Sequence, residues 1–157
     1  MKTHKYKHGL TLVEMLIVVG VIALLVTMVI GIAARIDNQS KERGLECTCA
    51  LLEFALQEYC ECTGKFPEQP EKDFTNAPLH SEYLYKELNL MPESRKILGK
   101  LADSLVKNEY GTADTPEIYD PWGTVLDYRY VPGDNFPELI SAGPDKIFGT
   151  ADDISSR

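Results

Sequence analysis

Glu14 is the residue whose type and position most clearly suggest a chemical role, because it is an acid at the edge of an apolar run. Residues 15–34 carry no charge, and a helix of about 20 apolar residues can cross roughly 30 Å of hydrocarbon. A carboxylate carried to the centre of a bilayer costs about 2.5–3.5 kcal/mol. We therefore expect Glu14 to have a functional role and a cationic partner.

A cleavage after Gly9 would create that partner. The new α-amino group of Leu10 would lie four residues before Glu14, one helical turn away on the same face, where opposite charges meet. It could equally reach the Glu14 of a neighbouring helix. One cut would thus supply the cation that the buried anion lacks.

A second group of carboxylates lies near the C-terminus. Asp145, Asp152 and Asp153 fall within nine residues, in a turn-rich stretch that also contains Gly143 and Gly149. Hard oxygen ligands of this kind suit Ca²⁺, although the spacing is not that of an EF-hand loop. An acidic terminal loop can also be a solvated turn, and the residues alone leave both interpretations open.

Four cysteines form a C-x-C…C-x-C pattern at Cys47, Cys49, Cys60 and Cys62. Outside the cytoplasm this number suggests two disulfides. In one continuous helix, however, the middle two would be about 16 Å apart along the axis, beyond the roughly 7 Å Cα limit of a bridge. Either the helix breaks, near Gly44 or within 60–62, or the cysteines pair with other segments or subunits, stay free, or bind a metal.

These residues need elements to position them. After the polar stretch 35–43, helical spacing returns at five apolar positions: Leu45, Leu52, Ala55, Leu56 and Tyr59. This predicts that the N-terminal helix continues to about Cys62 and ends at Gly64 and Pro67. Two short helices are expected at 81–90 and 92–108, with loops at 66–78 and 111–121 around them.

The C-terminal part changes to a two-residue period. From 125 to 131 the sequence alternates as a half-buried strand does, with Val125, Asp127, Arg129 and Val131 on one face. The turn 132–135 leads to a partner strand at 136–142. The expected fold is therefore α+β, a long helix that is transmembrane in its first half and packs on a small antiparallel sheet, with short helices between them.

Composition limits the function. We expect a leader at 1–9, a membrane helix at 10–34 and one extracytoplasmic domain at 35–157. The 157-residue chain has a formal net charge of −8, and loss of the leader with its three lysines would make it −11. Such an acidic chain is not expected to bind nucleic acid. Enzymatic constellations are missing, because His80 lies beyond the leader without a nucleophile nearby in the sequence.

The segment Gly9-Leu10-Thr11-Leu12-Val13-Glu14 resembles the type IV pilin-like superfamily. That resemblance implies cleavage after Gly9 by a prepilin peptidase, which also methylates the new N-terminus at Leu10. An ordinary signal peptide is the competing interpretation, but its apolar region spans roughly 7–15 residues and does not open with an acid. A plain signal anchor would leave Gly9 and Glu14 unexplained.

Further segments resemble the major pseudopilin of type II secretion systems, so that the resemblance covers about 9–67 and 118–154 and leaves the roughly 50 residues between these ranges unmatched. The matching residues are Tyr59, Gly64, Phe66 and Pro67 at the end of the long helix, and the segments Asp120-Pro121-Trp122-Gly123, Ser141-Ala142-Gly143-Pro144-Asp145 and Gly149-Thr150-Ala151-Asp152-Asp153-Ile154 in the tail. The resemblance implies calcium at the acidic loop through Asp145, Asp152 and Asp153, with Ser141 as a further candidate. Lys146 stands where the family often has Gly. A positive φ there would strain it, and its ammonium could weaken calcium binding.

The function that this resemblance implies is that of a structural subunit. It would sit in the bacterial inner membrane as a single-pass protein, with a cytoplasmic N-terminus and a periplasmic C-terminal domain. Its partners would be other copies in a pseudopilus, minor pseudopilins, the prepilin peptidase and an inner-membrane assembly platform. The alternatives are a minor pilin of a type IV pilus or DNA-uptake machine, and a membrane-anchored metal or redox module that uses the cysteines.

Overall fold

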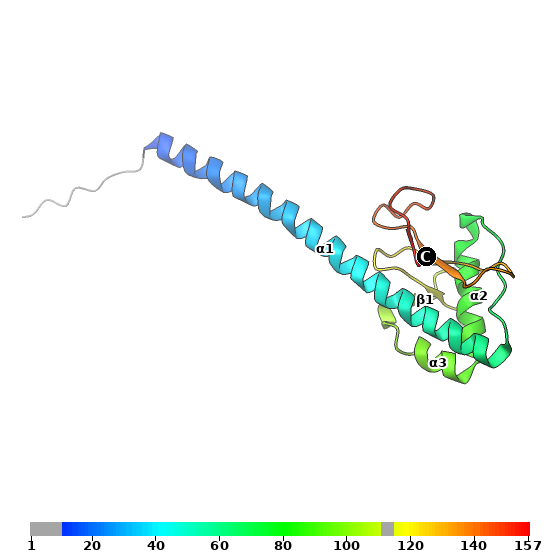
Figure 1. Cartoon of the computed structure of the whole chain (residues 1–157). Coiled ribbons are helices and arrows are strands. Elements are labelled where there is room, and N and C mark those ends of the chain that lie inside the picture. Colours follow the sequence, from blue (N-terminus) through cyan, green and yellow to red (C-terminus); the bar gives the residue numbers. More distant parts are fainter. Residues whose placement is uncertain (1–10, 111–114) are drawn as a thin grey trace, which may run out of the picture. The chain divides into compact units, whose positions relative to one another are not determined.

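The computed structural model describes residues 11–110 and 115–157, apart from the side chains of 31–34. Gly9 and Leu10, the expected cleavage site, lie outside the described residues. Contacts divide the chain into two compact units, Met1–Gln39 and Ser40–Arg157. One helix, α1 (Leu12–Thr63), supplies residues to both units, and it is the long ribbon of Figure 1. Each unit is described by itself below.

The first unit consists of the apolar part of α1. Its large apolar side chains from Leu12 to Ile30 are all exposed, with exposed fractions from 47% to 80%. A helix that is apolar all round has no polar face to offer to water. Its surroundings must therefore come from outside this unit of the chain.

In the second unit, α1 buries one face. The five positions expected from the sequence are buried: Leu45, Leu52, Ala55, Leu56 and Tyr59. The helix ends at Thr63, one residue beyond the prediction, and Gly64 follows with a positive φ of 78°. Gly44 does not interrupt it, so the alternative of a broken helix is wrong.

Two further helices follow α1, and they differ from the prediction. The chain forms a short 3₁₀ turn at Phe74–Asn76, α2 (Ala77–Leu90) and α3 (Pro92–Leu98). The second helix was expected to reach Asn108, but it stops ten residues earlier, at Leu98. The physical reason is that the N–H groups of Lys100 and Leu101 bond three residues back, to the carbonyls of Ile97 and Leu98, so the helix tightens into a turn. The chain then forms a 3₁₀ turn, Asp103–Leu105, and a strand.

The strands form two small antiparallel sheets. One pairs β1 (Val106–Lys107) with β2 (Glu117–Ile118), so part of the expected loop at 111–121 is a strand. The other has the order β3 (Asp127–Arg129), β4 (Glu138–Ser141) and β5 (Ile154–Ser155). Asp127 pairs with Ile140, which confirms the expected hairpin. The α+β layout is thereby confirmed.

The core lies where α1, α2, α3 and both sheets meet (Figure 1). Its largest wholly buried apolar side chains come from α1, α2 and the region of the two sheets: Leu45, Leu52, Leu56, Leu84, Leu88, Ile118, Leu126, Tyr128 and Leu139. The helix α3 adds Ile97 and Leu98. Tyr128 also donates a hydrogen bond from its hydroxyl to the Pro67 carbonyl at 2.7 Å. This bond ties the sheet to the segment that follows α1.

Candidate functional site

The first candidate site is the start of α1. The backbone N–H of Glu14 donates to the Thr11 hydroxyl oxygen at 3.2 Å, and the Thr11 N–H donates to a Glu14 carboxylate oxygen at 2.8 Å. These reciprocal bonds form a capping box. Glu14 therefore has a local role that the sequence analysis missed, although the spacing Thr11-x-x-Glu14 signals it. The box holds the carboxylate at the first turn, beside the segment that the expected cleavage would expose.

The helix that follows is suited to a membrane. Among the described residues, α1 is long and apolar enough to cross a bilayer, and none of its most apolar window is buried within the chain. Glu14 is the acid in its first turn. The candidate site thus consists of an exposed apolar helix with one acid in its first turn.

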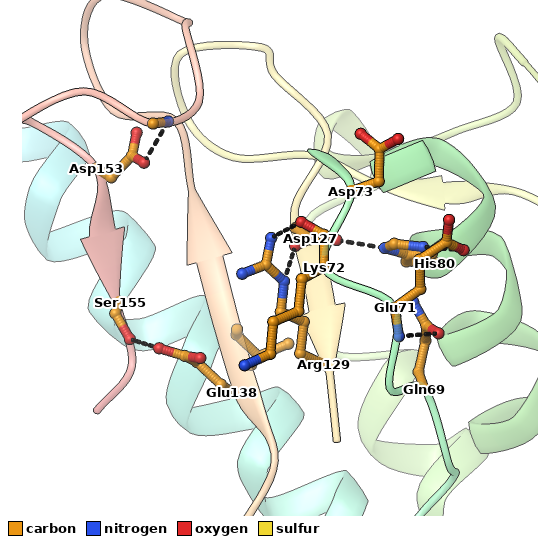
Figure 2. A network of polar contacts seen from close by, with 12 residues as sticks. Gln69, Glu71, Lys72, Asp73, His80, Asp127, Arg129, Glu138, Asp153 and Ser155 are labelled. Atoms are coloured by element: carbon orange, nitrogen blue, oxygen red, sulfur yellow. Dashed lines mark hydrogen bonds and ion pairs between the residues drawn. The ribbon is translucent and has the colours of Figure 1, made fainter. Parts of the chain in front are cut away.

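The second candidate site is the acidic loop 143–153. An Asp152 carboxylate oxygen accepts the Asp145 N–H at 3.0 Å, and the other oxygen accepts the Thr150 hydroxyl at 2.5 Å. The Thr150 hydroxyl and the Asp145 N–H lower the pKa of Asp152 below its ordinary value. Asp153 accepts the Gly149 N–H at 2.7 Å (Figure 2). The three aspartates thus organise one loop through backbone N–H groups.

One oxygen of this loop is left over. Asp153 Oδ1 is buried and has no hydrogen-bond partner among the described residues. A buried carboxylate oxygen without a donor is unfavourable unless a cation or water satisfies it. Even so, no three His, Cys, Asp or Glu side chains in the described ranges gather closely enough to hold a metal as they stand.

The backbone of the loop is tightly constrained. Gly143 has a φ of 66°, and a Cβ there would lie 2.2 Å from the Asp152 carbonyl oxygen. Lys146 also has a positive φ, 62°. The strain that the sequence analysis attached to a lysine at this position is therefore present. The Lys146 ammonium reaches the Gly123 turn, 4.0 Å from where a Gly123 Cβ would stand.

Ser141 is turned toward a residue that the sequence analysis did not select. Its buried hydroxyl donates to Asp120 Oδ2 at 2.6 Å and accepts the Gly143 N–H at 3.1 Å. Asp120 Oδ1 in turn accepts the N–H groups of Trp122 and Thr124 at 3.0 and 2.8 Å. The Asp120-Pro121-Trp122-Gly123 turn is thereby fixed to β4 and to the start of the acidic loop.

The four cysteines do not form one site. They are free thiols that lie on different faces of α1. Cys47 and Cys62 are exposed, and Cys49 and Cys60 are half-buried. Cys49 packs against the core, and its burial, with the nearby charge of Glu53, raises the pKa of its thiol to about 11. The cysteines of one chain therefore provide neither a metal cluster nor a disulfide.

A buried polar network joins α2, β3 and the loop before α2 (Figure 2). His80 Nδ1 lies 2.6 Å from Asp127 Oδ1, and Arg129 Nε lies 2.7 Å from Asp127 Oδ2. Burial raises the pKa of Asp127, while the His80 hydrogen bond and the Arg129 charge oppose that rise. The alternating pattern put Asp127 on one face of a half-buried strand without showing which face is buried, and these two partners allow its carboxylate to be wholly buried.

The network also touches the acidic loop through stacked groups. The Arg129 guanidinium lies 4.0 Å above the centre of the Phe74 ring. The Phe74 ring stacks on that of Phe148 at 4.7 Å. Phe148 belongs to the acidic loop, so this loop is held by apolar packing as well as by its own hydrogen bonds.

Comparison with known proteins bears on the N-terminus. Residues 4–30 match the family described as "Prokaryotic N-terminal methylation motif". Comparisons with curated proteins and with solved structures gave no match. The segment that contains Gly9, Leu10 and Glu14 thus carries the methylation motif, which indicates a type IV pilin-like protein processed by a prepilin peptidase.

Proposed function

We propose that this chain is a structural subunit of a type II secretion pseudopilus. It is anchored in the inner membrane by the first part of α1, cleaved after Gly9, methylated at Leu10, and assembled with other copies into a periplasmic fibre that drives protein secretion. The prepilin peptidase, minor pseudopilins and an inner-membrane platform are its partners. The unit Ser40–Arg157 is the periplasmic head.

One observation carries this proposal. The apolar side chains of α1 from Leu12 to Ile30 have no cover within the first unit, and Glu14 stands at their edge. Lipid can cover this surface before assembly, and the same segments of other copies can cover it afterwards. The methylation motif matched at 4–30 marks the same segment as a processing site.

Substitutions at Glu14 test the proposal because the capping box and the charge can be separated. Glu14→Gln keeps a side chain that can accept the Thr11 N–H but removes the charge, whereas Thr11→Ala removes the cap and keeps the charge. If Glu14 pairs with the α-amino group of a neighbouring copy, Glu14→Gln lowers the yield of sheared fibres by about 100-fold, as expected for an unpaired charge in lipid. Thr11→Ala should leave most fibres in place.

The opposite pattern would contradict the proposal. If Glu14→Gln assembles normally and Thr11→Ala does not, the carboxylate serves only to begin the helix. Intact mass of both variants supplies the control, because each must still be cleaved after Gly9 for the fibre yields to be compared.

We further propose that the acidic loop binds one Ca²⁺ through Asp145, Asp152 and Asp153. The unpartnered Asp153 Oδ1 and the Asp152 carbonyl packed against Gly143 supply oxygen atoms of the kind that Ca²⁺ prefers. Bound to the folded state only, the ion would stabilise the head by mass action. Ser141 would support the loop through the hydrogen bonds of its hydroxyl with Asp120 and Gly143 rather than as a calcium ligand.

Thermal unfolding of the full chain in detergent tests the calcium proposal. Calcium in excess should raise the melting temperature, and EDTA should reverse the rise. Asp153→Asn should abolish the response, whereas Lys146→Gly should enlarge it by removing a residue that is strained at a positive φ. A melting temperature that ignores both calcium and EDTA would contradict calcium binding and leave the assembly proposal untouched.

A further inference from the structure

No disulfide can form within one copy of this chain. All four cysteines lie on α1, which is continuous from Leu12 to Thr63. Cys49 and Cys60 are about 16 Å apart along the axis, and the two members of each C-x-C pair point about 160° apart around it. A bridge needs Cα atoms within about 7 Å and converging side chains. Any disulfide must therefore join two molecules.

Two of the cysteines are placed for such a bond. Cys47 and Cys62 are exposed, whereas Cys49 is half-buried and packs against the core. Exposed thiols can meet the thiol of another molecule, and a packed thiol with a raised pKa forms little of the reactive thiolate. Cys47 and Cys62, the outer cysteines along α1, are thus the reactive pair.

The outer cysteines share a face of α1 with an exposed aromatic ring. Positions 47 and 62 are about 60° apart around the helix, and position 54 lies within about 20° of 47 at the geometry of 100° per residue. Phe54 occupies that position and is 51% exposed. An apolar ring between two reactive thiols defines a contact surface, which we call the Cys47–Phe54–Cys62 face.

We propose that the Cys47–Phe54–Cys62 face contacts a second copy of this chain and that Cys47 of one copy forms a disulfide with Cys62 of the next. This inference rests on the proposed fibre. In a fibre each copy follows the last by the same rotation and translation, so the contact joins different residues and continues without closing. The required stagger is 15 positions, about 22 Å along the helix.

The same stagger gives a favourable charge pair. It sets Arg43 of one copy against Glu58 of the next. Within the described part of the chain, neither side chain is recorded in an ion pair, so both are available to a partner. The stagger also aligns Glu46 with Glu61, but both lie about 100° from the cysteine positions and on opposite sides of the contact.

The bond forms by thiol–disulfide exchange. The Cys47 and Cys62 thiols lose two protons and two electrons, and the S–S bond joins the two copies. The electrons reduce a disulfide donor of the extracytoplasmic space, which leaves as a dithiol, through a mixed disulfide with one of the cysteines. Oxidised glutathione can supply the same electron acceptor in a test.

The test uses the full chain in isolated membranes. Free thiols are blocked with N-ethylmaleimide, after treatment with oxidised glutathione, and the proteins are separated without reductant. We expect a ladder of multiples of the monomer mass that collapses to monomer with dithiothreitol. A monomer band alone after oxidation, or a band at the mass of a monomer joined to a different protein, would overturn the proposal.

Serine variants identify the bond. Cys47→Ser and Cys62→Ser should each remove every band above monomer, because the bond needs one cysteine of each kind, whereas Cys49→Ser and Cys60→Ser should leave the ladder. Coexpression of Cys47→Ser with Cys62→Ser should restore dimers and nothing larger. Dimers in either single variant alone would show like cysteines pairing and overturn the staggered contact.

Two further readouts separate this inference from the proposed function. Arg43→Glu should weaken the ladder several-fold, and Glu58→Arg in the same chain should restore it. Intact mass in the same samples reports cleavage after Gly9. Correct cleavage without a ladder would overturn only the disulfide contact, whereas a ladder on an uncleaved chain would overturn the pseudopilin proposal and keep the contact.

Discussion

The part of α1 in the first unit and the part in the second unit contain similar apolar residues, but these are exposed in the first and buried in the second. Leu16 and Leu25 in the first unit are 68% and 53% exposed, whereas Leu52 and Leu56 in the second are wholly buried. The second part has one apolar face, and that face meets α2, α3 and the sheets of the head. The first part is apolar on every face. Apolar residues at helical spacing thus indicate that the helix packs on its own head, and apolar residues on every face indicate that this part of the helix is covered by something other than its own unit.

The comparison predicts that one substitution has two outcomes on the same helix. Leu52→Ala leaves a cavity in the head and should lower its unfolding free energy by about 2–5 kcal/mol, or roughly 8 °C or more in melting temperature. Leu25→Ala should leave the melting of the head unchanged. Thermal unfolding of both full-length variants in detergent checks this. A matching loss in Leu25→Ala would show that the two parts are one folding unit.

Two glycines of the acidic loop, Gly143 and Gly149, test how closely the head is packed. Gly143→Ala places a methyl group 2.2 Å from the Asp152 carbonyl oxygen at a φ of 66°. The left-handed backbone alone costs about 1–2 kcal/mol, and the clash adds to it. Gly149→Ala also has a positive φ but meets nothing within 4 Å, so it should lose only the first amount. Equal losses measured by urea unfolding would refute the close approach.

The buried polar network provides a third comparison inside the head. His80→Ala removes the 2.6 Å contact to Asp127 Oδ1 and leaves a buried carboxylate oxygen without that partner. This should cost about 1–3 kcal/mol. Glu71→Ala is the matched control, because Glu71 is half-exposed and 3.4 Å from the other ring nitrogen, and a contact with an exposed carboxylate contributes at most about 1 kcal/mol. Similar losses in the two variants would contradict a network centred on Asp127.

The smallest expected effect depends on pH. Burial, then a hydrogen bond and charge repulsion with Glu117, raise the pKa of Glu82. A raised carboxyl pKa favours the folded state only while the group holds its proton, so this stabilisation is present in acid and is lost as the pH rises through the raised value. Glu82→Gln should therefore melt higher than the parent at pH 7 and equally near pH 4. The exposed control Glu68→Gln should show no such trend.

The sequence predicted the elements that carry long patterns. The end of α1, its five buried positions and the β3–β4 hairpin followed from periodicity and turn residues. The strands β2 and β5 have two residues each, which is too short for any period to be visible. The helix expected at 92–108 was wrong because apolar spacing continued through a turn after Gly99.

The candidate sites also differ in how far the sequence could predict them. Glu14 and the acidic loop could be found because their residues are close in sequence, although the capping bonds to Thr11 were missed. His80 and Asp127 are 47 positions apart, and nothing local in either segment signals that they meet. Asp120 was read only as part of a turn, because its bond to Ser141 depends on how β4 is placed.

If the uncovered part of α1 is a processed assembly segment, the mass of the mature chain must show the cleavage. The chain would be produced in a cell with a prepilin peptidase, extracted from membranes and measured intact. We expect a chain that begins at Leu10 and carries one added methyl group. A mature chain that begins at any other residue, or that keeps 1–9, would contradict it.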